Sequence, residues 1–556
     1  MSLVSSVPDA SSFSHVSVIP QPSKIVPQSG FFRLTSQTSI VADQGAYAEA
    51  SLLADWLSQS AGFPCPVMDD LETTGLRIVL TLDASLPSLG SEGYCLRVTS
   101  EFVEITAFHS LGLFYGVQTL LQLLPAAIFS DMLVEGQDWI IPCVDIEDAP
   151  RFAWRGAMLD VSRHFLPPAF LRKFIDLLAL HKMNVLQLHL TDDQGWRIEI
   201  KKYPKLTEIG AHRNRTLVGY AEYSPTHEKF DPFQEQFDGT PYQGYYTQSE
   251  MRDLVEYARL RHVTIVPEIE MPGHAQAAIA AYPELGCTGE QIEVSPRWGI
   301  HDVLYKPSER TFEFLTEVLA EIIDIFPSPY IHIGGDEAVK TQWRSSSECQ
   351  QFMREKGLPD EEAMQSYFIG RIDNFLMQRG RVLVGWDEIL EGGLSPGAVV
   401  MSWRGEQGGV AAARQGHDVI MAPYQYTYFD YYQSEDFASE PLAFPELLTL
   451  SAVYGYEPIP ADMPLEHQRH VLGAQCQLWT EYMPHTKQVE YMAFPRLSAL
   501  SEVTWASRAN KDYAGFLDRL PRHLVRLDAL RVRYRPMVCL ASPPIPLEQI
   551  LEPQLG

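Results

Sequence analysis

Basic residues are scarce in this chain. It has 43 lysines and arginines against 71 aspartates and glutamates, so its formal net charge is −28. A surface of that sign repels phosphate backbones and anionic lipid headgroups, and we expect neither nucleic acid nor an anionic membrane as a partner. The sequence also lacks a run of about 18 apolar residues, the length needed to cross a bilayer. No membrane span is therefore predicted.

Cysteine is sparse, and its pattern excludes two kinds of site. The seven cysteines are an odd number, are widely spaced and form no CxxC pair, so neither a disulfide framework nor a zinc site is indicated. We expect buried free thiols at these positions: Cys65, Cys95, Cys143, Cys287, Cys349, Cys476 and Cys539.

The first residues lack the features of an export signal. The segment from Met1 to Ser6 has neither a basic start nor an apolar centre. The compartment stays open: periplasmic or secreted if an export signal has been removed, and cytoplasmic otherwise.

The length of 556 residues predicts two or three domains. Residues 1–148 have the pattern of an α+β domain, with strands at 77–83, 94–100 and 102–108 and a helix at 110–124 that stops at Pro125. We interpret residues 141–150, which contain two prolines, as a linker.

From Arg151 onward, short apolar strands alternate with amphipathic helices, the pattern of parallel βα units. Eight such units predict a (β/α)8 barrel over residues 149–506. The alternative, an open doubly wound sheet, normally has a Gly-rich phosphate turn after an early strand, and the sequence has none. Residues 507–556 are predicted to form a helical tail packed on the barrel. The eight strands are expected at 156–161, 185–190, 264–269, 330–333, 382–386, 399–403, 419–423 and 471–479.

Polar and aromatic residues recur where these strands end. In a barrel of this type the carboxyl ends of the strands face the active site, and a core would not contain so many charges unless they were paired. Tryptophan and tyrosine faces stack on the apolar faces of pyranose rings, while carboxylates and arginine bind hydroxyl groups. The composition thus indicates a sugar site. Its residues are Asp160, Arg163, His189, Asp192, His274, His332, Asp336, Glu337, Trp386, Trp403, Tyr428, Asp430, Trp479 and Glu481.

Six of these segments, in order, resemble those of glycoside hydrolase family 20, the β-N-acetylhexosaminidases. The His332-Ile-Gly-Gly-Asp-Glu337 box is the most specific of them. Ile19-Pro-Gln-Pro and Gly112-Leu-Phe-Tyr-Gly116 resemble the non-catalytic domain of that family, so the likeness covers nearly the whole chain. The other boxes are Asp160-Val-Ser-Arg-His, His189-Leu-Thr-Asp-Asp, Pro267-Glu-Ile-Glu-Met-Pro-Gly-His, Gly385-Trp-Asp-Glu and Leu478-Trp-Thr-Glu.

The resemblance implies an exo-acting enzyme that releases terminal non-reducing β-linked GlcNAc or GalNAc with retention, without metal or cofactor. Glu337 would be the acid and then the base. Asp336 would orient the 2-acetamido group, whose oxygen attacks C1 and forms an oxazolinium, and Tyr428 would donate to that oxygen. Asp192 and His274 would form a relay behind Glu337. The sugar-binding set would be Arg163, Trp386, Trp403, Asp430, Trp479 and Glu481.

Alternatives stay open beside this hypothesis. A metal-dependent hydrolase would use His189, Asp192, His274 and Asp336, although the first strand offers no His-x-His pair. A sugar-binding protein without activity would keep the pocket but not need Glu337. Taken singly, His274 fits a structural histidine about as well, and Trp386 or Trp403 would more often lie in a core.

Further features bear on partners and substrates. We expect a small carbohydrate partner: a β-N-acetylhexosaminide, a chitooligosaccharide or a glycan terminus. The natural aglycone stays open, and so does a homodimer. The resemblance to bacterial members of the family implies a cysteine near Tyr305 that could pair with one like Cys287, but this chain has none there, so a bridge in that loop is not expected. An insertion at 214–244 would shape the leaving-group side or contact a partner subunit. Asp430 near O6 predicts poor turnover of 6-sulfated sugars.

Overall fold

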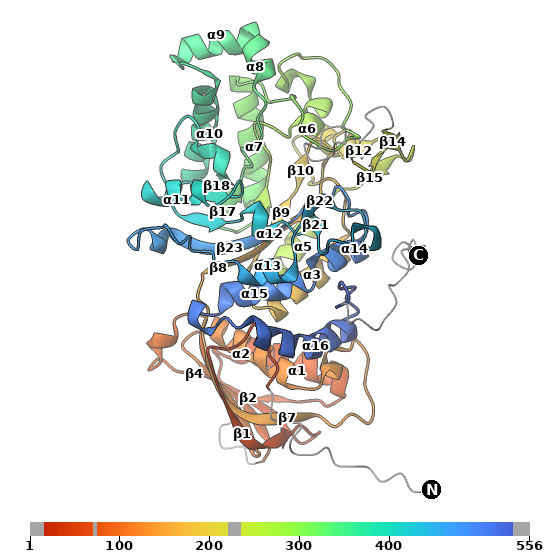
Figure 1. Cartoon of the computed structure of the whole chain (residues 1–556), viewed down its shortest axis with the longest axis vertical. Coiled ribbons are helices and arrows are strands. Elements are labelled where there is room, and N and C mark those ends of the chain that lie inside the picture. The colour runs from red at the N-terminus through yellow and green to blue at the C-terminus, as the bar shows by residue number, and fades with distance from the viewer. Residues whose placement is uncertain (1–15, 70–74, 221–234, 538–556) are drawn as a thin grey trace. The chain divides into compact units, whose positions relative to one another are not determined.

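The computed structural model describes residues 16–69, 75–220 and 235–537 (Figure 1). By their contacts these residues form two compact units. Unit 1 contains the chain up to Phe152 together with Ala179–Lys182 and Leu497–Arg535, and unit 2 contains Ala153–Leu178 and Met183–Arg496. No helix of the described part is both long and apolar enough to span a membrane.

Unit 1 is built on a seven-stranded mixed sheet of order β1-β7-β5-β6-β4-β2-β3. Two helices, α1 and α2, pack on it (Figure 1), and their apolar faces join the strands in one buried core that includes Tyr94, Ile105, Leu120 and Trp505. The strands are β1 Lys24–Arg33, β2 Ser39–Ala42, β3 Val67–Met68, β4 Arg77–Leu82, β5 Tyr94–Val98, β6 Phe102–Ala107 and β7 Ile140–Asp148, and the helices are α1 Tyr47–Ala61, α2 Ser110–Leu123, α15 Arg496–Trp505 and α16 Tyr513–Ala529.

The interpretation of residues 141–150 as a linker is wrong. Residues 140–148 form β7, which pairs antiparallel with both β1 and β5 and therefore lies inside the sheet. Its residues Ile141, Val144 and Ile146 are buried. Pro142 is tolerated next to the irregular register between Pro27 and Phe31 of β1.

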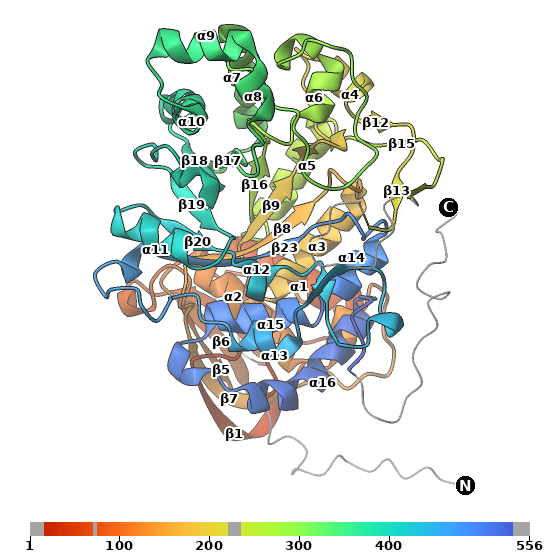
Figure 2. The ribbon, with the colours of Figure 1, turned by 45° about the horizontal axis from the view of Figure 1, so that its top comes forward.

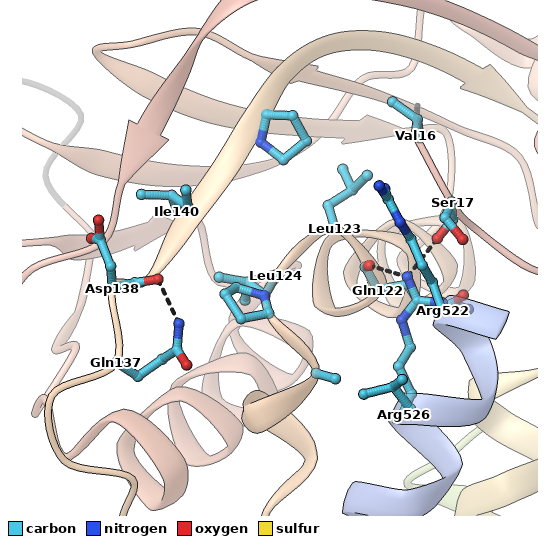
Figure 3. A pocket seen from close by; sticks show the side chains of 14 residues that line it. Val16, Ser17, Gln122, Leu123, Leu124, Gln137, Asp138, Ile140, Arg522 and Arg526 are labelled. Atoms are coloured by element: carbon cyan, nitrogen blue, oxygen red, sulfur yellow. Dashed lines mark hydrogen bonds between the residues drawn. The ribbon is translucent and has the colours of Figure 1, made fainter. Parts of the chain in front are cut away.

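The C-terminal helix belongs to unit 1 by its contacts, whereas the sequence placed it on the barrel. The guanidinium of Arg526 donates to the backbone oxygens of Ser17 and Gln122, and Arg519 forms a buried ion pair with Glu502. Arg522 and Arg526 extend from α16 along a cavity of about 470 Å³ (Figure 3). The domain boundaries drawn from the sequence remain predictions.

A buried ion pair joins two stretches of unit 1. The ammonium of Lys182 lies 2.8 Å from Oδ2 of Asp148, and neither side chain is exposed. Lys182 also donates to the hydroxyl of Tyr94, and Trp505 donates to Oδ1 of Asp148. These hydrogen bonds compensate the carboxylate and the ammonium for their lost hydration.

Unit 2 is a closed barrel of eight parallel strands in the order β16-β17-β18-β19-β20-β23-β8-β9 (Figure 2). All eight strands predicted from the sequence are present, and the predicted fold class is confirmed. The barrel strands are β8 Trp154–Asp160, β9 Val185–His189, β16 Thr264–Glu268, β17 Tyr330–His332, β18 Val382–Trp386, β19 Val399–Ser402, β20 Val419–Met421 and β23 Val471–Leu478.

The helices of unit 2 present apolar stripes to the barrel, as their 3.6-residue period predicts. Helix α5 begins with a capping box between Thr247 and Glu250. The helices are α3 Pro168–Leu180, α4 Lys205–Glu208, α5 Gln248–Arg259, α6 Gln276–Ala281, α7 Glu309–Ile325, α8 Thr341–Ser345, α9 Ser347–Lys356, α10 Glu361–Met377, α11 Gln407–Arg414, α12 Tyr424–Thr427, α13 Leu450–Gly455 and α14 Thr486–Ala493.

Short strand pairs lie in the connections of unit 2. They are β10 Thr191–Asp192 with β11 Gly195–Trp196, β12 His212–Arg213 with β15 Tyr242–Gln243, β13 Leu217–Val218 with β14 Gln236–Phe237, and β21 Tyr431–Tyr432 with β22 Phe444–Leu447.

Candidate active site

The parallel register of the barrel brings four polar residues to one level. Asp160 of β8 pairs with His189 of β9, His189 pairs with Glu268 of β16, and Glu268 pairs with His332 of β17. Each is the last residue of its strand. The carboxyl ends of four neighbouring strands therefore form one charged layer, as the sequence predicted for the active-site end.

Glu268 is the centre of that layer and is fully buried. Its Oε2 lies 2.8 Å from Nδ1 of His189, and its Oε1 lies 3.0 Å from Nδ1 of His332 and accepts a hydrogen bond from the indole of Trp386. Burial alone would raise the pKa of Glu268, but the two facing histidines hold it well below its usual range. Burial alone would lower the pKa of His189, but Glu268 and Asp192 outweigh that effect and raise the pKa to about 10. The protonated His189 therefore faces ionised carboxylates in this layer, and the opposite charges offset the cost of burying them.

Four of the predicted catalytic residues form one connected chain. Nδ1 of His274 lies 3.2 Å from Oδ1 of Asp192, and its Nε2 lies 3.4 Å from Oε2 of Glu337 and 3.6 Å from Oδ2 of Asp336. Asp192 is held from its other side by Arg163, whose Nη2 is 2.9 Å away. His274 is buried, yet these carboxylates raise its pKa well above its usual value despite the opposing effect of burial. A protonated imidazole in this place can donate to both sides.

Two residues of this connected set have an uncommon backbone conformation. Glu337 has φ +46° and His274 has φ +49°, left-handed values that non-glycine residues rarely adopt. Gly334, at φ +68°, has Glu270 directly over it, so that a Cβ there would lie 1.7 Å from Oε2 of Glu270. The two glycines of the box therefore allow the strand end to turn under a buried carboxyl group and to present Asp336 and Glu337.

Asp336 and Glu337 differ in their surroundings. The side chain of Asp336 is 11% exposed, whereas that of Glu337 is 27% exposed. Burial raises the pKa of Asp336 to about 6, with the cation of His274 lowering it and Glu337 raising it. Its Oδ1 is buried and has no hydrogen-bond partner. Such an atom is costly unless a ligand supplies the missing donor.

An aromatic group lines the site beside these carboxylates. Trp403 stacks on Tyr428 at 6.1 Å between ring centroids, and Tyr428 and Trp386 both contact Trp479. Trp403 and Trp479 are partly exposed, whereas Trp386 is 1% exposed and donates to Glu268. The structure thus brings the three predicted tryptophans together, two facing solvent and one at the base.

The polar residues that were predicted to bind sugar also meet here. The guanidinium of Arg163 lies over the ring of Trp479, 5.0 Å from its centroid, and Arg163 and Glu481 interact electrostatically. Burial and Glu481 together raise the pKa of Asp430 well above its usual value. Oδ1 of Asp430 is buried without a hydrogen-bond partner, as is Oδ1 of Asp336. Asp336 and Asp430 therefore each bring to the site a buried carboxyl oxygen that lacks a donor.

Comparisons with known proteins agree with this geometry. The model of the glycosyl hydrolase family 20 catalytic domain matches residues 152–508, and that of the family's domain 2 matches residues 15–149. The chain belongs to glycosyl hydrolase family 20. The predicted family and the predicted enzyme class, a glycoside hydrolase of the β-hexosaminidase type, are confirmed.

Individual relatives of this family 20 chain are similar over most of its length. A β-hexosaminidase of Porphyromonas gingivalis is 44% identical over 93% of this chain, which spans 64% of the relative. A β-hexosaminidase of Akkermansia muciniphila is 32% identical over 84% of this chain and 91% of its own length. The solved β-N-acetylhexosaminidase of Streptomyces coelicolor A3(2) superposes with a TM-score of 0.79 at 32% identity, over 95% of this chain and 98% of its own.

Two further carboxyl groups lie in this family 20 site. From the sequence, Glu270 was a candidate without direct substrate contact, and Glu388 had no assigned role. Glu270 is buried, and neither of its oxygens has a hydrogen-bond partner, while burial and Asp336 raise its pKa well above its usual value. Burial and Asp336 also raise the pKa of Glu388 to about 8, and Glu388 accepts from the indole of Trp403. In the sequence, Glu270 ends the Pro-Glu-Ile-Glu box and Glu388 ends the Trp-Asp-Glu box, and these positions could have indicated that both belong to the site.

Three groups of donors in the described residues are compact enough for a metal ion. They are His189, Glu268 and Glu270; Asp192, Asp193 and His274; and His274, Asp336 and Glu337. Each contains a histidine whose pKa is raised by neighbouring carboxylates, so a metal would have to displace a tightly held proton. Metal binding at any of the three groups would therefore release a proton.

The insertion predicted at 214–244 is described in part. Tyr223, Phe230 and Phe233 lie outside the described residues. The hydroxyl of Tyr220 donates to the backbone oxygen of Ala443 and lies 3.0 Å from that of Tyr432, and its ring contacts Tyr482. The start of the insertion thus lies against the segments that follow Asp430 and Glu481.

Proposed function

We propose that this chain is a retaining exo-β-N-acetylhexosaminidase that uses the acetamido group of its substrate as the nucleophile. The observation that carries the proposal is the buried, unpartnered Oδ1 of Asp336 beside the more exposed Glu337, with His274 touching both carboxylates. Asp336 accepts from the N–H of the acetamido group and fixes its orientation. The carbonyl oxygen of that group then attacks C1 as the glycosidic bond breaks.

Glu337 supplies the proton in this proposal. It protonates the leaving oxygen, and the bond electrons depart with the aglycone. The resulting oxazolinium is positively charged, and the carboxylate of Asp336 stabilises it. Glu337 then takes a proton from water, which opens the ring at C1 and restores the β configuration, so that two inversions give retention. Because the nucleophile is already attached to the sugar, the attack is intramolecular, which is worth effective molarities on the order of 10⁵ M or more.

His274 and Asp192 position the acid in this mechanism. The imidazole of His274 donates from Nδ1 to Asp192, and its Nε2 faces Glu337 at 3.4 Å, with Asp336 at 3.6 Å. Arg163 and His189 in turn fix Asp192. The relay therefore orients the carboxyl group of Glu337 and balances charge as the proton leaves and returns.

The sugar would lie against Trp403 and Trp479, with Tyr428 donating to the acetamido oxygen. Arg163 and Glu481 bind O3 and O4, and the unpartnered oxygen of Asp430 accepts from O4 or O6. No residue in this set selects one configuration at C4 by exclusion. We therefore propose activity on both GlcNAc and GalNAc. A Streptomyces plicatus β-hexosaminidase and a Vibrio harveyi exo-β-N-acetylglucosaminidase, both similar to this chain, have been solved with GlcNAc.

The test compares aryl glycosides that differ at one position. We expect hydrolysis of the 4-nitrophenyl β-glycosides of GlcNAc and GalNAc, and at least about 100-fold lower kcat/KM for the glucoside, which has no acetamido group. A thiazoline mimic of the oxazolinium should inhibit both reactions competitively. Comparable turnover of the plain glucoside, or a trapped ester between the sugar and a protein carboxylate, would contradict the proposal.

Retention and metal independence are tested separately. Proton NMR during hydrolysis should show the β-anomer of the released sugar before mutarotation. Activity should survive EDTA. Loss on chelation with recovery on adding zinc would favour the metal-dependent alternative.

A further inference from the structure

Two cysteines of unit 2 have their sulfur atoms close together. Sγ of Cys287 lies 3.9 Å from Sγ of Cys349. Cys287 directly follows the short 3-10 turn Pro283–Leu285 in the connection from β16 to α7, and Cys349 lies in the first turn of α9, after β17. The resemblance implied a partner for Cys287 near Tyr305, and the sequence has no cysteine there.

The surroundings of the pair make one sulfur the better thiolate. The hydrogen bond from Cys287 is the main factor that lowers the pKa of Cys349 to about 7, against the effect of burial. Ser346 caps α9 and bonds to the N–H of Cys349, so the positive end of the helix dipole lies next to this thiol. Lys306 adds a nearby positive charge.

Solvent exposure, in contrast, favours reaction at the other sulfur, that of Cys287. Cys349 is fully buried in a cluster with Leu304, Trp343 and Met364, whereas Cys287 is partly exposed at its edge. An external oxidant can therefore reach Cys287 first. In the mixed disulfide Cys287 no longer donates to Cys349, and the helix end and Lys306 are the groups that still favour the Cys349 thiolate, which resolves the product.

We propose that Cys287 and Cys349 are a redox modification site that closes into a disulfide when a low-molecular-weight disulfide oxidant is present. The Cys287 sulfur attacks one sulfur of the oxidant and forms a mixed disulfide, releasing the first thiol. The Cys349 thiolate then attacks the Cys287 sulfur and releases the second thiol. Two protein thiols are oxidised, one oxidant disulfide is reduced, and the two protons pass to the released thiolates.

The bond would tie together the two connections that carry the catalytic chain. It closes a loop of 62 residues between the segment after His274 and the helix after Glu337. Within this loop Tyr305 donates its N–H to Pro272, and its carbonyl accepts from the indole of Trp343. A covalent link across a loop of this length restricts the unfolded chain. Its effect is therefore on stability, and the reacting groups keep their places.

The experiment treats the full chain with oxidised glutathione and then measures its thiols, mass and unfolding. We expect the loss of two thiols per chain, a Cys287–Cys349 peptide in the proteolytic map under non-reducing conditions, and a rise in Tm of about 5 °C. Dithiothreitol should reverse all three changes. Turnover of an aryl GlcNAc substrate at 25 °C, where that activity is found, should change less than about twofold.

Variants make the result specific. Cys349→Ser should abolish both the cross-link and the rise in Tm. Cys287→Ser should have the same effect, and it provides the test where Cys349→Ser folds poorly. Cys95→Ser, a partly exposed thiol of unit 1, is the matched control and should oxidise as the wild type does. The proposal is overturned if both thiols survive the oxidant, if either pairs with another cysteine, or if the linked chain is no more stable than the reduced one.

Discussion

Asp336 and Glu337 show how one dipeptide acquires two different surroundings. Asp336 is buried beside His274, Glu270 and Glu388, whereas Glu337 reaches toward solvent from a left-handed backbone position. A buried carboxylate next to a cation is suited to stabilising a positive charge, and an accessible one can exchange protons with leaving group and water. Environment, more than residue type, assigns the two roles.

The clearest residue-scale prediction concerns the proton donor. Glu337→Gln keeps the size and the contact with His274 but cannot transfer a proton, so kcat for a glycan substrate should fall by about 10²–10⁴-fold. Steady-state kinetics and the dissociation constant for GlcNAc check it. Glu290→Gln, at an exposed loop position, is the control. A variant with near-normal turnover would remove Glu337 from the mechanism.

A second prediction concerns pH. Burial raises the pKa of Asp336 to about 6, so below that pH the carboxyl is neutral and cannot stabilise the oxazolinium. We expect kcat/KM to fall on the acidic side with a midpoint near pH 6. His274→Asn removes the cation that lowers this pKa, so the acidic midpoint should move to higher pH. An unmoved acidic limb in the variant would show that another group controls it.

The sequence predicted the residues that act through their position in a motif, and missed those that act through burial. Asp336, Glu337, His274 and Asp192 were expected together and do form one chain of contacts. Glu270 is different: its sequence box marked it as a candidate, but the fold of Gly334 beneath it could not be read from that box. The pairing of Cys287 with Cys349 was also invisible, because it joins segments that follow different strands.

At the scale of elements, the turn after β17 depends on a glycine for two reasons. Gly334→Ala would place a methyl group 1.7 Å from Oε2 of Glu270 and would also be strained at φ +68°. Gly357, which ends α9, has the same φ but open space around it, so Gly357→Ala isolates the conformational cost of about 1 kcal/mol. We expect a lower Tm for both variants and at least about 100-fold lower activity only for Gly334→Ala. Thermal unfolding and steady-state kinetics of Gly334→Ala and Gly357→Ala test this prediction. Equal activity of the two variants would contradict the role of the turn.

The barrel was easier to predict than the sheet of unit 1, and the reason is physical. Strands of a parallel barrel are buried on both faces and form short continuous apolar runs, which stand out from the amphipathic helices between them. Strand β7 combines three buried apolar residues with Pro142 and acidic residues, and β1 is mostly exposed and irregular near Gly30. Such patterns resemble loops until the partner strands are known.

At the scale of the whole molecule, the charge of −28 should affect charged substrates. Burial and Glu481 raise the pKa of Asp430, so this residue repels a 6-sulfate less than the sequence suggested, and the long-range field remains. We expect lower kcat/KM for a 6-sulfated aryl GlcNAc than for the plain sugar at low ionic strength. The ratio of the two kcat/KM values should move toward one in about 0.5 M salt, where the screening length is only a few ångström. The plain sugar is the control, and faster hydrolysis of the sulfated compound at low salt would refute the argument.

The make-up of unit 1 from three separate stretches has a consequence for inheritance. A single genetic crossover near residue 152 would transfer the sheet but leave behind Lys182, the cation of buried Asp148, and Arg526, the donor to Ser17 and Gln122. A carboxylate stranded in this way is strongly destabilising. Viable chimeras should therefore exchange all three stretches together, the short one at Ala179–Lys182 included.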